Sequence, residues 1–217
     1  VIEVVSTYIS SAMPKKRTID LEVIKQCLPS VSLKYDKSSD YHYDHISAFI
    51  KSVRGSDPDA ALYWMAKMLE AGEDPRYIVR RLIILASEDI GNADPFALVL
   101  ATSALDAVEF IGMPEAKIIL AQVVTYLACA EKSNAAYEAL ANVEEELKKG
   151  PVREVPDHLK DGHRDREALG HGKGYIYPHD HEGSFVPQEY MPLHKFFYNP
   201  KDVGVERKIK ERLERWR

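Results

Sequence analysis

A glycine followed closely by an Asp-Pro pair occurs three times between residues 55 and 95, and this pattern constrains the fold more than any other feature. An aspartate at a helix N-cap accepts hydrogen bonds from free backbone N–H groups, and proline suits the first helical position. Glycine adopts the left-handed conformation that closes the preceding helix. The occurrences are Gly55 before Asp57-Pro58, Gly72 before Asp74-Pro75 and Gly91 before Asp94-Pro95. They predict helices over about 58–71, 75–90 and 95–111.

The flanking segments also carry helical signals. Gly112 and Pro114 predict a fourth helix that runs to about residue 130. Further helices are predicted at about 20–28, 41–54, 134–150 and 204–217. In the helix at 58–71 the apolar residues Ala61, Met65 and Leu69 recur at helical spacing. Because short links make consecutive helices antiparallel neighbours, we predict an all-α fold, an antiparallel helical bundle or collar.

The composition is that of an ordinary globular protein, with 45% hydrophobic and 29% charged residues and a net charge of −5. No apolar run approaches the roughly 20 residues that a membrane-spanning helix requires. The net charge gives no general reason to expect a nucleic-acid surface, although residues 206–217 hold six Lys or Arg against three Glu. Cys27 and Cys129 lie in apolar surroundings and are predicted to be buried free thiols. Because the chain begins at Val1 within a helical pattern, we expect it to be part of a longer protein.

Between residues 151 and 200 prolines, glycines, histidines and aromatic residues replace the helical pattern. We predict a long irregular C-terminal arm with at most short strands around residues 174–180. Its tyrosines and phenylalanines favour packing over disorder, because disordered segments are poor in aromatic residues. The polar connector at residues 30–40 is the best candidate for a domain boundary, which we place near residue 34.

The sequence contains no recognisable catalytic motif. Nothing matches the phosphate loop G-x-x-x-x-G-K-[ST], and no nucleophile elbow is present. The arm holds four histidines, which are His163, His171, His179 and His181. Only His179 and His181 have the close spacing of structural zinc ligands, without a cysteine, and His42 and His45 lack the H-E-x-x-H arrangement. We therefore favour packing over metal binding, and expect no catalytic, cofactor-binding or metal-binding residue.

Basic residues near the Asp-Pro helices are stronger candidates for a functional surface. Arg76 and Arg80 lie one helical turn apart with Arg81 beside them, while Lys51 and Arg54 precede the first Asp-Pro helix. One interpretation is a solvated helix face. The other is a phosphate or subunit contact, for which the planar guanidinium group is well suited.

Two acidic residues occupy an unfavourable position. Glu88 and Asp89 lie at the C-terminal end of the predicted helix at 75–90. There the helix macrodipole disfavours negative charge by about 0.3–1 kcal/mol. We hypothesise that these carboxylates meet a cation from another helix or subunit.

Several runs, in order along the chain, carry a resemblance to a known family. They are HYDHISAFIKSVRGSDPDAALYWMAKMLEAGEDPRYIVRRLIILASEDIGNADP, YLACAEKSNAAY, VPDHLKD and GHGKGYIYPHDHEGSFVPQEYMP. These runs resemble the C-terminal region of the replication-associated recombination protein A family (RarA, also MgsA), which are bacterial AAA+ ATPases akin to Werner-helicase-interacting protein. The resemblance covers the chain from about residue 35 to its end. Residues 1–30 resemble the tail of the helical lid that follows the ATPase core.

The resemblance implies a parent protein that is a DNA-dependent ATPase of replication forks, recombination and repair, cytoplasmic and associated with the nucleoid. It implies a lid remnant at 1–34, a helical oligomerisation domain at 35–150, and an arm with a basic helix packed on it at 151–217. ATP and Mg²⁺ would bind in the ATPase core, outside this chain. The implied partners are further copies in a homotetramer, together with DNA and single-strand-binding protein.

Two alternatives remain at this stage. The chain could be a helical adaptor that binds a protein partner as a monomer, or a metal-dependent enzyme built on the histidines of the arm. The mass of the chain in solution distinguishes an oligomeric collar from a monomeric adaptor. Metal analysis of the purified protein tests the hypothesis of a metal-dependent enzyme.

Overall fold

The structure is a computed structural model that describes residues 40–161 and 170–217. These residues form seven α-helices and no strand, which confirms the predicted all-α fold. The helices are α3 (Asp40–Arg54), α4 (Pro58–Glu70), α5 (Pro75–Leu85), α6 (Phe96–Ile111), α7 (Ala116–Cys129), α8 (Ala135–Lys149) and α9 (Glu206–Trp216). The predicted helix at 20–28, Cys27 and His163 lie outside the described residues.

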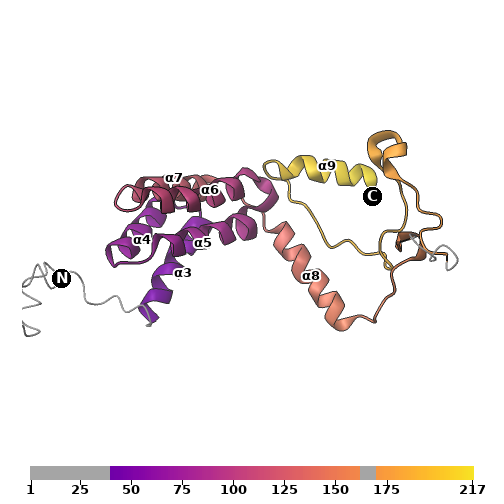
Figure 1. Cartoon of the computed structure of the whole chain (residues 1–217), viewed down its shortest axis with the longest axis horizontal. Coiled ribbons are helices and arrows are strands. Elements are labelled where there is room, and N and C mark those ends of the chain that lie inside the picture. Colours follow the sequence, from indigo (N-terminus) through magenta and orange to yellow (C-terminus); the bar gives the residue numbers. More distant parts are fainter. Residues whose placement is uncertain (1–39, 162–169) are drawn as a thin grey trace, which may run out of the picture.

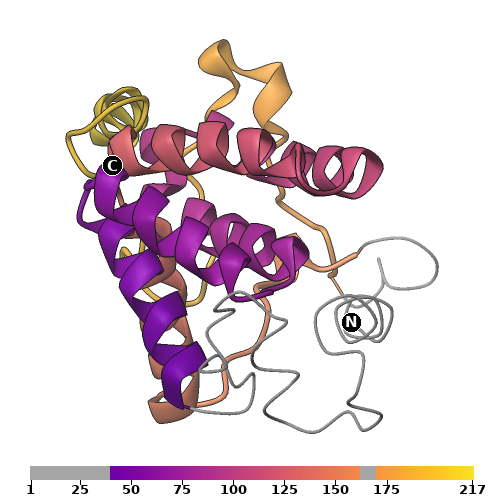
Figure 2. The same ribbon diagram turned by 90° about the vertical axis from the view of Figure 1, so that its left-hand side faces the viewer.

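Helices α3 to α7 form a two-layered bundle (Figure 1). The pair α6 and α7 makes one layer, and Figure 2 shows it lying across α3, α4 and α5. Helix α4 packs against α3 and α7, and α5 packs against α6. The consecutive pairs α3 and α4, α5 and α6, and α6 and α7 are packed neighbours, as the sequence predicts. For α4 and α5 this prediction is wrong, because these two consecutive helices pack against other helices and not side by side.

The core of the bundle is apolar and closed. Its largest fully buried apolar side chains are Phe49, Met68, Ile78, Leu82, Leu85, Ile90, Leu120 and Leu127. Burying one such side chain stabilises the fold by about 1.5–3 kcal/mol. Helix α6 differs, because it turns Ala97, Ala101 and Ala104 toward the core. These small residues let α6 approach its neighbours closely, and most of its large apolar side chains face outward.

Asp57-Pro58 and Asp74-Pro75 start α4 and α5 as predicted, with the proline at the first helical position. The third pair differs slightly, because α6 begins at Phe96, one residue after Pro95. The backbone N–H groups of Ala60, Arg76 and Phe96 donate to the carboxylates of Asp57, Asp74 and Asp94 at 2.9, 2.9 and 3.2 Å. Gly72 and Gly91 adopt positive φ angles of 87° and 52°, again as predicted. The prediction for Gly55 is wrong. The Gly55 N–H still makes a helical hydrogen bond to the Lys51 carbonyl at 2.8 Å, so Gly55 continues the helix. The residue with left-handed backbone is the next one, Ser56, with φ of 61°.

The helix predicted at 75–90 is α-helical only to Leu85. Residues Ala86–Ile90 continue it as a single π-helical turn, and Gly91–Ala93 form a 3₁₀ turn. At Gly91 a Cβ atom would lie 2.6 Å from the Ser133 carbonyl oxygen, so only glycine allows this approach. The π turn ends against the α7–α8 loop, where the Ser133 N–H donates to the Ile90 carbonyl at 3.2 Å.

Helix α8 leaves the bundle, and the arm that follows it returns toward the bundle at α9 (Figure 1). The arm has no strand at residues 174–180, where the sequence predicts at most short strands, and residues 178–180 form a 3₁₀ turn. The side chain of Gln188 explains this difference. Its Oε1 accepts from the Ile176 N–H at 3.2 Å and its Nε2 donates to the Ile176 carbonyl at 2.7 Å, so a side chain replaces a strand partner.

The returning arm is fixed to the bundle beside Ala93. The Val205 N–H donates to the Ala93 carbonyl at 2.8 Å. A Cβ atom on Gly204 would lie 2.2 Å from that same carbonyl oxygen, so this position requires glycine. At the other end of α9 the ring of Trp216 stacks on Phe185, with centroids 5.2 Å apart. Helix α9 is thus held at both ends.

Candidate functional site

The outer face of the α6–α7 layer is apolar and nearly uncharged. Helix α6 carries two charged residues, Asp106 and Glu109, and helix α7 carries one, Lys117. Large apolar side chains project from it instead, and we define the α6–α7 outer face by Phe96, Val99, Phe110, Ile111, Ile118 and Tyr126. Phe110 is 92% exposed and Ile118 is 73% exposed. These side chains gather toward the two ends of the layer, and exposed polar residues lie between them along the helices: Thr102, Ser103, Asp106 and Gln122. Exposed apolar side chains gathered in this way mark an interaction site.

Local contacts hold this face in shape. The rings of Phe96 and Tyr126 meet edge to face, with centroids 6.0 Å apart, and join the start of α6 to α7. The Tyr126 hydroxyl donates to Asp94 at 2.6 Å, and this hydrogen bond raises the pKa of the tyrosine. The face is therefore formed before any partner binds, which lowers the ordering cost of association.

The carboxylates of Glu88 and Asp89 do meet a cation, as hypothesised, and it comes from another helix of the same chain. The Arg54 guanidinium donates through Nε to Asp89 at 2.6 Å and through a terminal nitrogen to Glu88 at 3.1 Å. The hydrogen bond to Asp89 raises the pKa of Arg54. This pair of bonds fastens the π turn to the end of α3.

Lys132 makes a second set of hydrogen bonds between segments at the same end of the bundle. Its ammonium group donates to the Ser56 hydroxyl at 2.8 Å and to the carbonyls of Ala128 and Ala130 at 2.8 and 2.9 Å. Burial lowers the pKa of this lysine. These bonds connect the end of α7 to the α3–α4 turn.

The structure does not bring the remaining predicted arginines into this cluster. Arg76 pairs with its own N-cap residue, Asp74, at 2.8 Å, and Arg80 is exposed on α5. Arg81 is half-buried, and its Nε–H has no hydrogen-bond partner among the described residues. Lys51 is exposed in the last turn of α3. A phosphate or subunit contact by any of these residues stays a prediction.

The histidines are dispersed. His45 is buried against the Trp64 ring, with centroids 5.6 Å apart. His158 Nε2 lies 2.6 Å from the Glu189 carbonyl oxygen in the arm. Within residues 40–161 and 170–217 no three His, Cys, Asp or Glu side chains gather in a metal-binding arrangement. No helix in these same ranges is long and apolar enough to cross a membrane.

The burial predicted for Cys129 is wrong. This residue is exposed at the end of α7. The preceding residues Leu127 and Ala128 occupy the core positions of that turn, so the helical rotation carries Cys129 outward.

A buried polar network joins the arm to the bundle, and sequence reasoning missed it. The Tyr198 hydroxyl donates to Glu206 at 2.6 Å and accepts from the Asn92 amide at 3.0 Å. The other Glu206 oxygen accepts from the Lys201 N–H at 3.2 Å, and Glu206 is fully buried. Burial and the bond to Glu206 raise the pKa of Tyr198 to about 12. The sequence does not indicate that Glu206 is buried, because this residue begins a helix that is strongly polar and basic.

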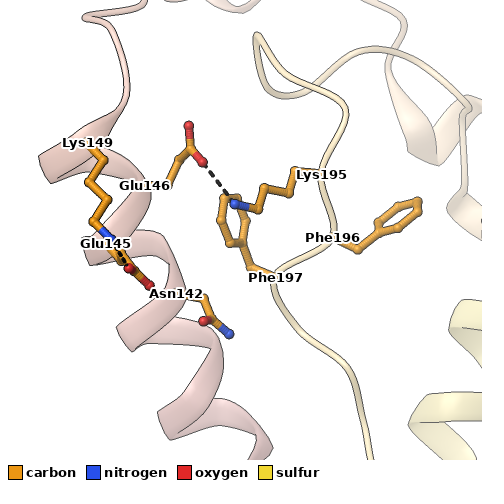
Figure 3. Close-up of a pocket in the computed structure, with 7 residues that line it drawn as sticks. All are labelled: Asn142, Glu145, Glu146, Lys149, Lys195, Phe196 and Phe197. Atoms are coloured by element: carbon orange, nitrogen blue, oxygen red, sulfur yellow. Dashed lines mark hydrogen bonds and ion pairs between the residues drawn. The ribbon is translucent and has the colours of Figure 1, made fainter.

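A hollow of about 420 Å³ lies between α8 and the arm (Figure 3). It is lined by Asn142, Glu145, Glu146, Lys149, Lys195, Phe196 and Phe197. Lys195 donates to Glu146 at 2.9 Å, and Lys149 pairs with Glu145. Hydrogen bonds from Lys195 and Arg153 lower the pKa of Glu146. Since the charges of the lining pair with one another, the hollow offers no evident site for a charged ligand.

Comparisons with known proteins agree on one family. The family model described as "MgsA AAA+ ATPase C terminal" matches residues 55–217, and the model described as "AAA C-terminal domain" matches residues 1–54. The boundary between the two matches falls at the end of α3, beside Arg54.

Named relatives come from bacteria and from a eukaryote. The Replication-associated recombination protein A of Coxiella burnetii is 44% identical over 92% of this chain and 46% of its own length. The protein of that name in Escherichia coli K12 is 40% identical over 91% of this chain and 45% of its own length. The ATPase WRNIP1 of Dictyostelium discoideum is 46% identical over 76% of this chain and 19% of its own length. The chain thus spans less than half the length of these relatives.

Proposed function

Because the chain belongs to the MgsA AAA+ ATPase C-terminal family, we propose that it forms the collar through which a DNA-dependent AAA+ ATPase assembles into a homotetramer. The parent would act in replication-fork maintenance, recombination and repair, in keeping with the names of its bacterial relatives. The observation that carries the proposal is the α6–α7 outer face. DNA and single-strand-binding protein as partners, and the cytoplasmic and nucleoid location, stay predictions.

The chemistry of the face favours a second copy of the chain as its partner. Interfaces between obligate subunits are more apolar than ordinary protein surface, and charged residues are depleted at their centre. The one lysine of this layer, Lys117, is paired with Glu70 of α4 at 2.6 Å and so is held toward the rim. An exposed pair of helices such as α6 and α7 can meet its own copy across a twofold axis, because the same patch then serves both subunits.

The test is the absolute mass of the chain in solution, by light scattering and sedimentation equilibrium at micromolar concentrations. We expect the wild type to be a tetramer. The double variant Val99→Glu, Ile118→Glu places charge on both helices of the face and should reduce the mass at least by half. Ala66→Glu adds the same charge at an exposed position of α4 and should leave the mass unchanged.

A wild-type monomer at every concentration would contradict the collar and favour the alternative, a helical adaptor for a protein partner. An oligomer that the double variant leaves intact would show that the subunits meet elsewhere. Val99 and Ile118 are both exposed, so the substitutions should leave the bundle folded, and circular dichroism of each variant checks this.

A further inference from the structure

Helix α9 has two chemically different sides. The side toward the rest of the chain carries Glu206, which is fully buried, and Leu213, which is half-buried. The opposite side carries three exposed basic residues, Lys208, Arg212 and Arg215. Because they are spaced by four and three positions, they lie along one side of the helix. We call these three residues the α9 basic stripe.

The positive charges of the α9 basic stripe are not neutralised by the protein itself. Asp202, just before α9, pairs with two other basic residues, since its carboxylate lies 2.6 Å from Arg207 Nε and 4.0 Å from Lys210 Nζ. In the described part of the chain, no carboxylate forms an ion pair with a residue of the stripe. Glu211 borders the stripe, so three positive charges there face one negative charge. Such a local excess attracts anions even on a chain with a net charge of −5.

Aromatic contacts hold the stripe in place at the end of α9. The Trp216 ring stacks on Phe185 of the arm, with an angle of 2° between the ring planes. The Arg212 guanidinium lies over the Trp216 ring, 5.9 Å from its centroid. Arg217 donates to the Tyr198 carbonyl at 2.8 Å, which adds a second contact with the arm. A ligand therefore meets basic groups on a helix that is already docked, and this lowers the ordering cost of binding.

We propose that the α9 basic stripe binds the phosphate backbone of a nucleic acid without reading its base sequence. The inference rests on the proposed function, because it names the surface with which a DNA-dependent protein of this family would hold DNA. The stripe extends about 10 Å along α9, since each helical residue rises about 1.5 Å. Phosphates recur about every 3.4 Å along each strand of a duplex, so the stripe matches about three of them. Contacts between basic side chains and phosphates position a protein but carry no sequence information.

Other anionic surfaces fit the stripe less well. A helix that lies on a membrane needs a broad apolar face beside its basic face, and in α9 the apolar Ile209 and Leu213 are half-buried on the side of Glu206. An acidic protein segment would have to present carboxylates at the spacing of the stripe, whereas a nucleic acid carries a phosphate in every repeat. Two of the three basic residues are arginines, whose planar guanidinium group binds phosphate through two hydrogen bonds.

The experiment measures the affinity of the chain for a labelled single-stranded oligonucleotide and for a duplex of equal length, by fluorescence anisotropy over a series of salt concentrations. The test variant replaces the whole stripe: Lys208→Gln, Arg212→Gln, Arg215→Gln. At low salt it should bind about tenfold more weakly or worse. The slope of log affinity against log salt should fall by about 2 for the single strand and by about 3 for the duplex, as expected for three lost phosphate contacts.

Two further variants serve as controls. The first removes the same charge from exposed positions of α3, α5 and α8: Lys51→Gln, Arg80→Gln, Lys148→Gln. It should leave the salt slope unchanged. The second, Arg212→Lys with Arg215→Lys, keeps the charge of the stripe and should also retain the slope. A loss of slope in this second control would mean that disturbance of α9, and not loss of charge, weakens binding, and it would overturn the inference.

Three other results would overturn the inference. They are a wild type that binds neither probe, an equal loss of affinity in the test variant and the first control, and an acidic peptide that binds the stripe as tightly as the single strand of equal charge. Light scattering of the same samples separates this inference from the collar. A tetramer that binds no nucleic acid overturns this inference alone, and a monomer that binds through the stripe overturns the collar alone.

Discussion

Tyr198 connects the arm to the bundle through one hydroxyl group, so its titration should be visible in stability. The pKa of this group is about 12 in the folded protein and about 10 in an unfolded chain. The folded state therefore holds the proton more tightly, and the stabilisation is fully present below about pH 10. As pH rises from about 10 to about 12, the unfolded chain releases its proton first, and the stabilisation is lost.

The variant Tyr198→Phe should remove this dependence while keeping the ring. At pH 8 we expect a loss of about 2 kcal/mol in the free energy of unfolding, because Glu206 is buried and loses a charge-assisted hydrogen bond. Urea denaturation followed by circular dichroism, repeated between pH 8 and pH 11.5, measures the difference between wild type and variant. That difference should shrink above pH 10. A constant difference would show that Tyr198 and Glu206 are not linked as described.

At the scale of an element, the π turn that continues helix α5 should be stabilised by its charged contacts. This turn directs Glu88 and Asp89 toward Arg54, and the Asp89 side chain is only 11% exposed. The double variant Glu88→Gln, Asp89→Asn should lower the free energy of unfolding by about 1 kcal/mol, since it replaces charged hydrogen bonds with neutral ones. Glu70→Gln is the matched control. It breaks the well-exposed pair with Lys117, so it should lower the free energy of unfolding less than the double variant does. Unchanged stability and assembly in the double variant would mean that these carboxylates require no cation.

Some elements of the fold can be predicted from the local sequence, and others cannot. Asp57 and Asp74 start helices because N-capping depends on a single side chain and the next turn. The bonds between the π turn and Arg54 could not be predicted from local spacing, because Arg54 lies more than thirty residues earlier in the chain. The scarcity of charged residues in α6 and α7 indicates an apolar surface. The spacing of the apolar residues, however, does not reveal which of them face outward. That choice is made by the small residues Ala97 and Ala101, which let α6 approach the core.

For the whole molecule, the unequal distribution of burial predicts two levels of stability. The bundle holds nearly all the buried apolar side chains, whereas in the described part of the arm and α9 only Val186 and Glu206 are buried. The arm should therefore open locally without global unfolding, because few contacts oppose it. In native-state hydrogen exchange, the amides of α4 to α7 should exchange through global unfolding, and those of α9 through a smaller opening. Tyr198→Phe should speed exchange in α9 at least tenfold beyond its effect on α4 to α7. The amides of α9 and α7 could instead show equal protection from exchange and lose it together in the variant. The protein would then be a single cooperative unit, and the division into two levels of stability would be wrong.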